Sequence, residues 1–237
     1  GGYRYARYRP SLTAVRRARL QLPAGADRAW LASAIASQQL ARDLINTPAN
    51  DMGPEELAGA ASDLAAQQGG SVEIVSGVAL EQQFPLIAAV GKGSPRPPRL
   101  VDLRFTRPGA PRITLVGKGV CFDTGGLDIK PDTGMLNMKK DMGGAATALA
   151  LAHMIMARDL KVRLRVIIPA VENSISGTSF RPRDVFVSRK GISVEIGNTD
   201  AEGRLILADA LALAGEDEPA LMIDFATLTG AARVALG

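Results

Sequence analysis

The sequence has very little of the chemistry that most zinc sites, disulfide-stabilised proteins and membrane proteins require. Its 237 residues include one histidine, His153, and one cysteine, Cys121. A zinc site built from several His or Cys ligands is therefore excluded, and so is an internal disulfide. No stretch reaches the ~18 uninterrupted apolar residues of a spanning helix, and residues 1–10 lack the apolar core of a signal peptide. These absences predict a cytoplasmic protein without a membrane partner.

Composition and charge are those of an ordinary globular protein, with one exception at the N-terminus. Hydrophobic residues make up 46% and charged residues 22% of the chain, and the net charge is +4. Much of the positive excess is carried by early arginines that alternate with Tyr3, Tyr5 and Tyr8: Arg4, Arg7, Arg9, Arg16, Arg17 and Arg19. Arginine next to aromatic side chains can bind nucleic acid through phosphates and stacked bases. The more common role of such a run is a solvated linker or an oligomer contact, so nucleic-acid binding is kept as the alternative function.

Predicted strands and helices alternate along the chain. Helices are expected at 27–46, where Asp27 suits the N-cap, and at 54–68, 143–159 and 202–215. Strand-like runs occupy 71–75, 85–91, 99–105, 112–117, 161–171 and 220–226, with two short strands around 186–188 and 192–197. Such alternation predicts an α/β fold, a three-layer αβα domain with a central mixed sheet.

Two stretches, 116–146 and 198–207, share one local plan: an apolar run, a glycine-rich turn that bears acids, and an apolar helical run. Together they carry most of the candidate chemistry: Lys118, Asp123, Lys130, Asp141, Asp200, Glu202 and Arg204. Turns at the carboxyl ends of strands are where open α/β sheets bind ligands. Four carboxylates on two such turns carry too much negative charge for one pocket unless cations join them.

Carboxylate oxygens suit Zn²⁺, Mn²⁺ or Mg²⁺, and four acids with a bridging water could hold two ions. A lysine beside a dication loses its proton readily and could then bind as a neutral amine, while a second lysine could stay protonated and polarise a carbonyl. Taken singly, each acid could instead be an N-cap, and Lys130 could be a surface lysine. Arg204 could form a structural ion pair with Glu202 or Asp209.

Three longer motifs, VGKGVCFDTGG, KKDMGGAA and NTDAEGRLILADAL, closely resemble the M17 leucyl aminopeptidases. NTDAEGRL is the signature octapeptide of that family and is intact here. The similarity extends from about Asp43 to the last residue. It implies a two-metal aminopeptidase that removes a leucine-like N-terminal residue from peptides, with a hydroxide that bridges two divalent ions as the nucleophile.

The resemblance also implies residue roles. By motif position, the metal ligands of the family correspond to Lys118, Asp123, Asp141, Asp200 and Glu202. Asp123 and Glu202 correspond to the two ligands that bridge the ions. Lys130 resembles the lysine that polarises the scissile carbonyl, and Arg204 the arginine that holds a bicarbonate ion as general base. The first side-chain pocket is expected at Met138, Thr227 and Leu228. The family resemblance further implies a homo-hexamer.

The resemblance divides the chain into two parts. Residues 1–30 are expected to be a remnant of the linker that precedes the catalytic domain, and residues 31–237 the catalytic domain itself. Family members continue beyond the final TLTGAARVALG, so a C-terminal truncation is expected. Another two-metal hydrolase, such as a phosphatase, is a weaker alternative, because the sequence shows no evident phosphate cradle.

Overall fold

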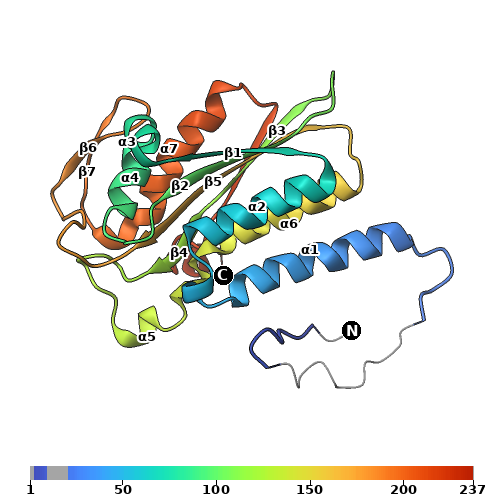
Figure 1. Ribbon diagram of the computed structural model, residues 1–237, viewed down its shortest axis with the longest axis horizontal. Coiled ribbons are helices and arrows are strands. Elements are labelled where there is room, and N and C mark those ends of the chain that lie inside the picture. The colour runs from blue at the N-terminus through green and yellow to red at the C-terminus, as the bar shows by residue number, and fades with distance from the viewer. Residues whose placement is uncertain (1–2, 10–20, 237) are drawn as a thin grey trace.

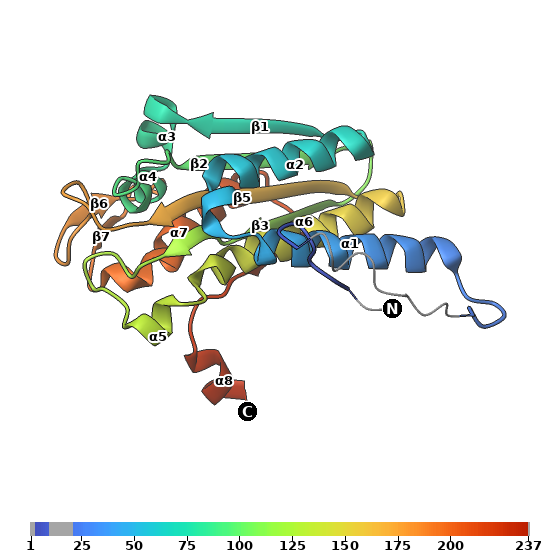
Figure 2. The ribbon, with the colours of Figure 1, turned by 60° about the horizontal axis from the view of Figure 1, so that its bottom comes forward.

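A mixed sheet lies at the centre of the fold in the computed structural model, which describes residues 3–9 and 21–236. Its strand order is β1-β2-β5-β3-β8, and β4 pairs with β5 beyond the end of β3 (Figure 2). β3, β4 and β8 run parallel to β5, whereas β2 is antiparallel to both of its neighbours, β1 and β5. The strands span β1 Ser71–Ser76, β2 Arg99–Phe105, β3 Arg112–Gly117, β4 Gly119–Asp123, β5 Arg163–Asn173 and β8 Leu221–Phe225. The predicted mixed sheet is confirmed.

Helices cover both faces of this sheet (Figure 1). One face carries α1 Arg28–Asn46, α2 Pro54–Gln68 and α6 Gly143–Ala157, and the other carries α3 Gly77–Gln83, α4 Pro85–Gly91 and α7 Glu202–Glu216. Successive side chains of a strand point to opposite faces. Val166 and Ile168 of β5 therefore enter one apolar cluster, while Ile167 and Val171 enter the other. The three-layer αβα architecture follows from these two cores.

Burial on both faces explains the apolar sequences of β5 and α6. From Leu164 to Asn173 every residue of β5 is buried, as expected for a central strand with helices above and below. α6 lies between α1, α2 and the sheet and is apolar nearly all round. α1 begins where Asp27 accepts a hydrogen bond from the Trp30 amide at 2.9 Å, as predicted.

The prediction of a strand at 85–91 is wrong, because these residues form helix α4. A short apolar run is compatible with either element, and here Pro85 stands at the first helical position, where its missing N–H costs nothing. The Asp209 carboxylate of α7 then accepts a hydrogen bond from the Leu86 amide at 2.8 Å. This partner is 123 residues away, so nothing local in the sequence shows it. The preceding short helix α3 was likewise not predicted.

Smaller elements complete the description. β6 Val185–Val187 and β7 Ser193–Glu195 are the two predicted short strands, and they pair antiparallel. Single turns of helix are found at Ala49–Asp51, α5 Asp132–Met135, η3 Met138–Met142 and η4 Thr199–Ala201, and α8 spans Ala231–Leu236. Within residues 3–9 and 21–236, no helix combines the length and the apolarity that crossing a bilayer demands.

The N-terminal tyrosines contact the end of α1 and the turn that follows it. Tyr3 donates to Asp43 at 2.5 Å, the Tyr5 and Thr47 hydroxyls lie 2.9 Å apart, and the Tyr8 hydroxyl donates to Asp51. These contacts involve the three tyrosines whose rings the nucleic-acid alternative would use for stacking. Three of the arginines in that alternative, Arg16, Arg17 and Arg19, lie outside the described residues, and nucleic-acid binding stays a prediction.

Candidate metal centre

Lys118 occupies the break between β3 and β4, where the chain leaves one segment of the sheet and enters the next. Its amide donates to Phe225 O of β8 at 2.9 Å, and its carbonyl accepts from the Ala145 amide of α6 at 2.9 Å. The approach of α6 requires Gly144, because a Cβ there would lie 2.1 Å from Phe225 O. The glycine pair that opens α6 thus lets three elements meet at the backbone of Lys118.

The Lys118 side chain lies between two buried acids. Its Nζ is 2.7 Å from Asp141 Oδ2 and 2.9 Å from Glu202 Oε1, and none of the three side chains is more than 3% exposed. Asp141 lies in η3, just before α6, and Glu202 is the first residue of α7. The lysine passes directly over Gly203, where a Cβ would lie 2.6 Å from Lys118 Cε. All three of the motifs described above therefore meet at one ammonium group.

A second lysine joins the other two acids. Lys130 Nζ is 3.1 Å from Asp123 Oδ2 at the end of β4 and 2.5 Å from Asp200 Oδ1 in η4. Asp123, Asp141 and Glu202 each place one carboxylate oxygen within 4.8 Å of the others. The structure therefore brings the four predicted acids and both lysines into one site at the carboxyl ends of parallel strands.

Burial and mutual repulsion dominate the electrostatics. The pKa of Glu202 is raised to about 7, because burial and the charges of Asp123 and Asp141 together outweigh the lowering effect of Lys118. Burial by itself would lower the pKa of Lys118, but Glu202 and Asp141 outweigh it and the net shift is upward. For Lys130, burial is likewise outweighed by Asp200 and Asp123, which raise the pKa to about 12. Four ionised carboxylates and two ammonium groups would leave a charge of −2.

The donor set fits divalent cations. Among the described residues, Asp141 Oδ2, Asp200 Oδ1 and Glu202 Oε2 are buried without a hydrogen-bond partner. The first two lie beside a lysine, but no ion-pair contact of Glu202 Oε2 is found in this part of the chain. Buried carboxylate oxygens require a hydrogen bond, a counter-charge or a metal. Clustered carboxylates of this kind suit Mg²⁺, Mn²⁺ or Zn²⁺.

A cavity of about 720 Å³ opens onto these groups, and it is lined by every residue for which a site role was predicted. Met138 of η3 lines this cavity, as do Thr227 and Leu228, which follow β8. Thr227 also donates to Asp141 Oδ1 at 2.7 Å, so it supports an acid as well as lining the cavity.

Arg204 has an exposed side chain on α7 that reaches the same cavity. The ion pairs of Arg204 with Glu202 or Asp209 are not formed within the described part of the chain. Asp209 is instead fully buried and accepts from the amides of Leu86 and Arg189, both at 2.8 Å. Arg204 therefore remains available to an anion in the cavity.

Asn173 is a site residue that the sequence analysis missed. It is the last residue of β5 and is fully buried. Its Nδ2 donates to Asp123 Oδ1 at 2.9 Å and to Thr199 O at 3.0 Å. One amide thus links the turn after β4 to the turn that carries Asp200. The sequence does contain a pattern that indicates this role, because Asn173 is a polar residue at the carboxyl end of an apolar strand.

The chain is similar to several known proteins. A family model described as the cytosol aminopeptidase family, catalytic domain, matches residues 39–237. A probable cytosol aminopeptidase of Rhodococcus erythropolis is 43% identical over 256 residues, which cover 100% of this chain and 50% of the relative. The crystal structure of the cytosol aminopeptidase from Coxiella burnetii superposes with a TM-score of 0.92 at 54% identity, covering 99% of this chain and 51% of that one.

A further structure, the bottromycin maturation enzyme BotP in complex with Mn, has a TM-score of 0.86 at 37% identity and covers 99% of this chain and 52% of BotP. The chain therefore spans about half the length of the relatives it matches.

Proposed function

The chain belongs to the cytosol aminopeptidase family, and from this membership we propose that it is the catalytic part of a metallo-aminopeptidase that removes N-terminal residues from peptides. The observation that carries the proposal is the buried cluster of Asp123, Asp141 and Glu202, whose oxygens lie within 4.8 Å of one another. The names of the relatives suggest a cytosolic protein, and the hexamer remains a proposal by resemblance.

We assign the binding of two divalent ions to the acids and the buried lysine: Lys118, Asp123, Asp141, Asp200 and Glu202. Zn²⁺ and Mn²⁺ are the first choices and Mg²⁺ the third, and BotP offers a precedent for manganese. Bound there, the ions would lower the pKa of water and so supply hydroxide near neutral pH. For Lys118 to act as a neutral ligand it must lose its proton, which a neighbouring dication favours.

Lys130 has the properties of the group that stabilises the developing negative charge. In the metal-free site Asp200 and Asp123 raise its pKa to about 12, and it lines the cavity beside both acids. An ammonium fixed by two carboxylates can donate to a scissile carbonyl oxygen as that oxygen becomes an oxyanion, which is where electrostatic stabilisation contributes most. Arg204, exposed at the same cavity, is assigned to hold bicarbonate, which supplies a general base when bound.

The apolar side chains at the cavity favour an apolar N-terminal residue. Met138 and Leu228 offer thioether and aliphatic contact, whereas Thr227 is turned towards Asp141. A leucine-like side chain fits this lining better than a charged one because its burial needs no polar partner. We therefore propose peptides with a free N-terminus and an apolar first residue as substrates.

The test is hydrolysis of leucine p-nitroanilide after addition of Mn²⁺ or Zn²⁺. Asp123→Asn should remove both the activity and tight metal binding, because this acid lies between Lys130 and the other carboxylates. Asp63→Asn makes the same chemical replacement at an exposed acid on α2 and is the matched control. Wild-type protein that binds the metal but hydrolyses no aminoacyl substrate would contradict the proposed reaction and leave the metal site intact.

A further inference from the structure

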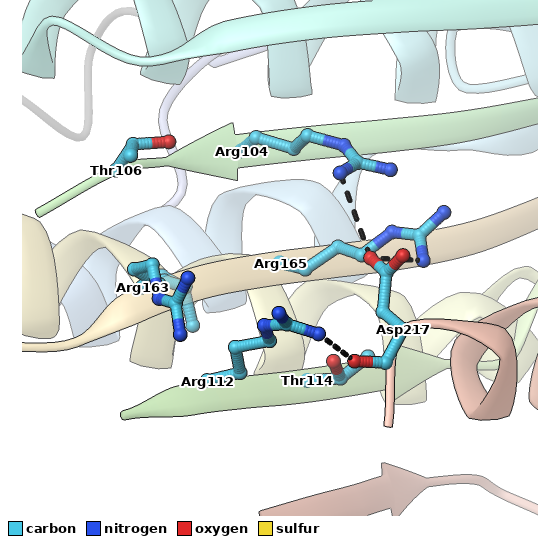
Figure 3. A pocket seen from close by; sticks show the side chains of 8 residues that line it. Arg104, Thr106, Arg112, Thr114, Arg163, Arg165 and Asp217 are labelled. Carbon is cyan, nitrogen blue, oxygen red and sulfur yellow. Dashed lines mark hydrogen bonds and ion pairs between the residues drawn. The ribbon is translucent and has the colours of Figure 1, made fainter. Parts of the chain in front are cut away.

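A second charged cavity lies at the opposite end of the sheet from the metal centre. It has a volume of about 340 Å³ and is lined mainly by four arginines, with Thr114 and Asp217 (Figure 3). The arginines come from three neighbouring strands and point into the same space: Arg104 from β2, Arg112 from β3, and Arg163 and Arg165 from β5. β3 begins at this cavity and ends next to Lys118, so the two sites are roughly 17 Å apart along the strand.

Two of the arginines are neutralised by acids. Arg165 Nη2 is 2.6 Å from Asp102 Oδ2, and Arg165 Nη1 is 2.7 Å from Asp217 Oδ2. Arg104 shares the same two acids, at 2.9 Å from Asp102 and 3.5 Å from Asp217. Asp102 and Arg165 are almost completely buried. This network fixes the floor of the cavity.

The other two arginines have no carboxylate within salt-bridge distance in the described part of the chain. Arg112 donates to the backbone carbonyl of Asp217, and Arg163 Nε donates to Ala110 O at 2.7 Å. Each guanidinium therefore keeps N–H groups for which the described residues supply no acceptor. Four arginines and two aspartates leave a charge of +2 around the cavity.

We propose that this cavity is a binding site for the phosphate group of a small molecule. The surplus charge of +2 matches a phosphate dianion, and planar guanidinium groups donate paired hydrogen bonds to oxyanions. Thr114, buried on β3 next to Arg112 and opposite Arg165 in the sheet, adds a hydroxyl that can donate to a phosphate oxygen. The volume lies at the lower end of small-molecule sites, which span about 300–1,000 Å³. The site is separate from the proposed peptidase reaction and does not depend on it.

Phosphate binding is tested by calorimetry. Inorganic phosphate or pyrophosphate is titrated into the chelator-treated chain at constant ionic strength. Chelation ensures that no metal ion at the other site can bind the probe. Arg112→Gln and Arg163→Gln should each weaken binding by about 10-fold to 100-fold, the range expected for a charge-assisted hydrogen bond, and the double variant should abolish it. Arg163→Lys, which keeps the charge but loses the planar fork, should bind more weakly than wild type and more tightly than Arg163→Gln.

Arg107→Gln is the matched control, because Arg107 is an exposed arginine that pairs with Asp159 and does not line the cavity. It should bind phosphate as wild type does. Absence of phosphate binding by the wild-type chain, or equal losses in Arg107→Gln and Arg163→Gln, would overturn the proposal. Acetate that binds as tightly as phosphate and competes with it would identify a carboxylate site instead and would also overturn it.

Discussion

Gly203→Ala should have two opposite effects on the free energy of unfolding. It raises the helix propensity of α7, and it displaces the side chain of Lys118. Gly203 lies in the first turn of α7, where replacing glycine by alanine normally stabilises a helix by about 0.5–1 kcal/mol. The new Cβ, however, would lie 2.6 Å from Lys118 Cε and 2.8 Å from Nζ. No side chain tolerates such contacts, so the end of Lys118 must move.

Movement of Lys118 removes its contacts at 2.7 Å to Asp141 and 2.9 Å to Glu202. Both carboxylates are buried, and breaking a buried ion pair costs about 3–5 kcal/mol when one partner is lost. After subtraction of the helix gain, we expect Gly203→Ala to lower the free energy of unfolding by about 2–4 kcal/mol. The chain should be free of metal and held at a pH above the pKa of about 7 of Glu202, so that the acids are charged.

The assay is denaturant unfolding, with Gly59→Ala as the matched control. Gly59 is an exposed glycine within α2, and nothing lies within 4 Å of a Cβ placed there. This substitution should stabilise the chain by about 0.5–1 kcal/mol. If Gly203→Ala stabilised the chain as much as Gly59→Ala, Lys118 would not be held between the two acids, and our description of the metal-free site would be wrong.

Three further substitutions test separate parts of the account. Asp209→Ala leaves the buried amide of Leu86 and the half-buried amide of Arg189 without their acceptor and should cost at least about 1–3 kcal/mol in denaturant unfolding, the penalty for one buried amide without a partner; a loss below 1 kcal/mol would show that α4 does not depend on this carboxylate. Asn173→Ala removes the link between Asp123 and Thr199 and should weaken Mn²⁺ binding about 10-fold to 100-fold, as for other groups that orient metal ligands; unchanged calorimetric affinity would deny it a positioning role. Lys130→Ala should retain bound metal but lower kcat about 10²-fold to 10³-fold, and release of metal would refute the role given to Lys130.

The sequence was most informative where a motif combined a strand end, a glycine and an acid. Asp123 and Glu202 were predicted to share a site because acids that follow parallel strands meet at one edge of a sheet, and the structure brings them together. The buried helix α6 was readable from its continuous apolar residues. Long elements with strong patterns are set by local sequence, and here tertiary structure did not override them.

Local sequence could not show partners that come from distant parts of the chain. Residues 85–91 were predicted as a strand because they form a short apolar run. The carboxylate that accepts a hydrogen bond from the Leu86 amide belongs to Asp209 of another helix, so the local sequence does not show it. The cationic cavity was equally invisible, since Arg104, Arg112 and Arg163 become neighbours only when β2, β3 and β5 pair. The role of Asn173 likewise depends on the close approach of two turns. Each miss involves a contact between residues that are far apart in sequence.

The assignment of the metal centre is tested by the number of divalent ions bound per chain, obtained by titrating Mn²⁺ or Zn²⁺ into the chelator-treated chain. We expect two ions for the wild-type chain, because four carboxylates and Lys118 converge in this site, and loss of both ions in Glu202→Gln. A chain that binds neither ion, or a Glu202→Gln variant that binds both as tightly as wild type, would contradict the assignment of this cluster as the metal centre.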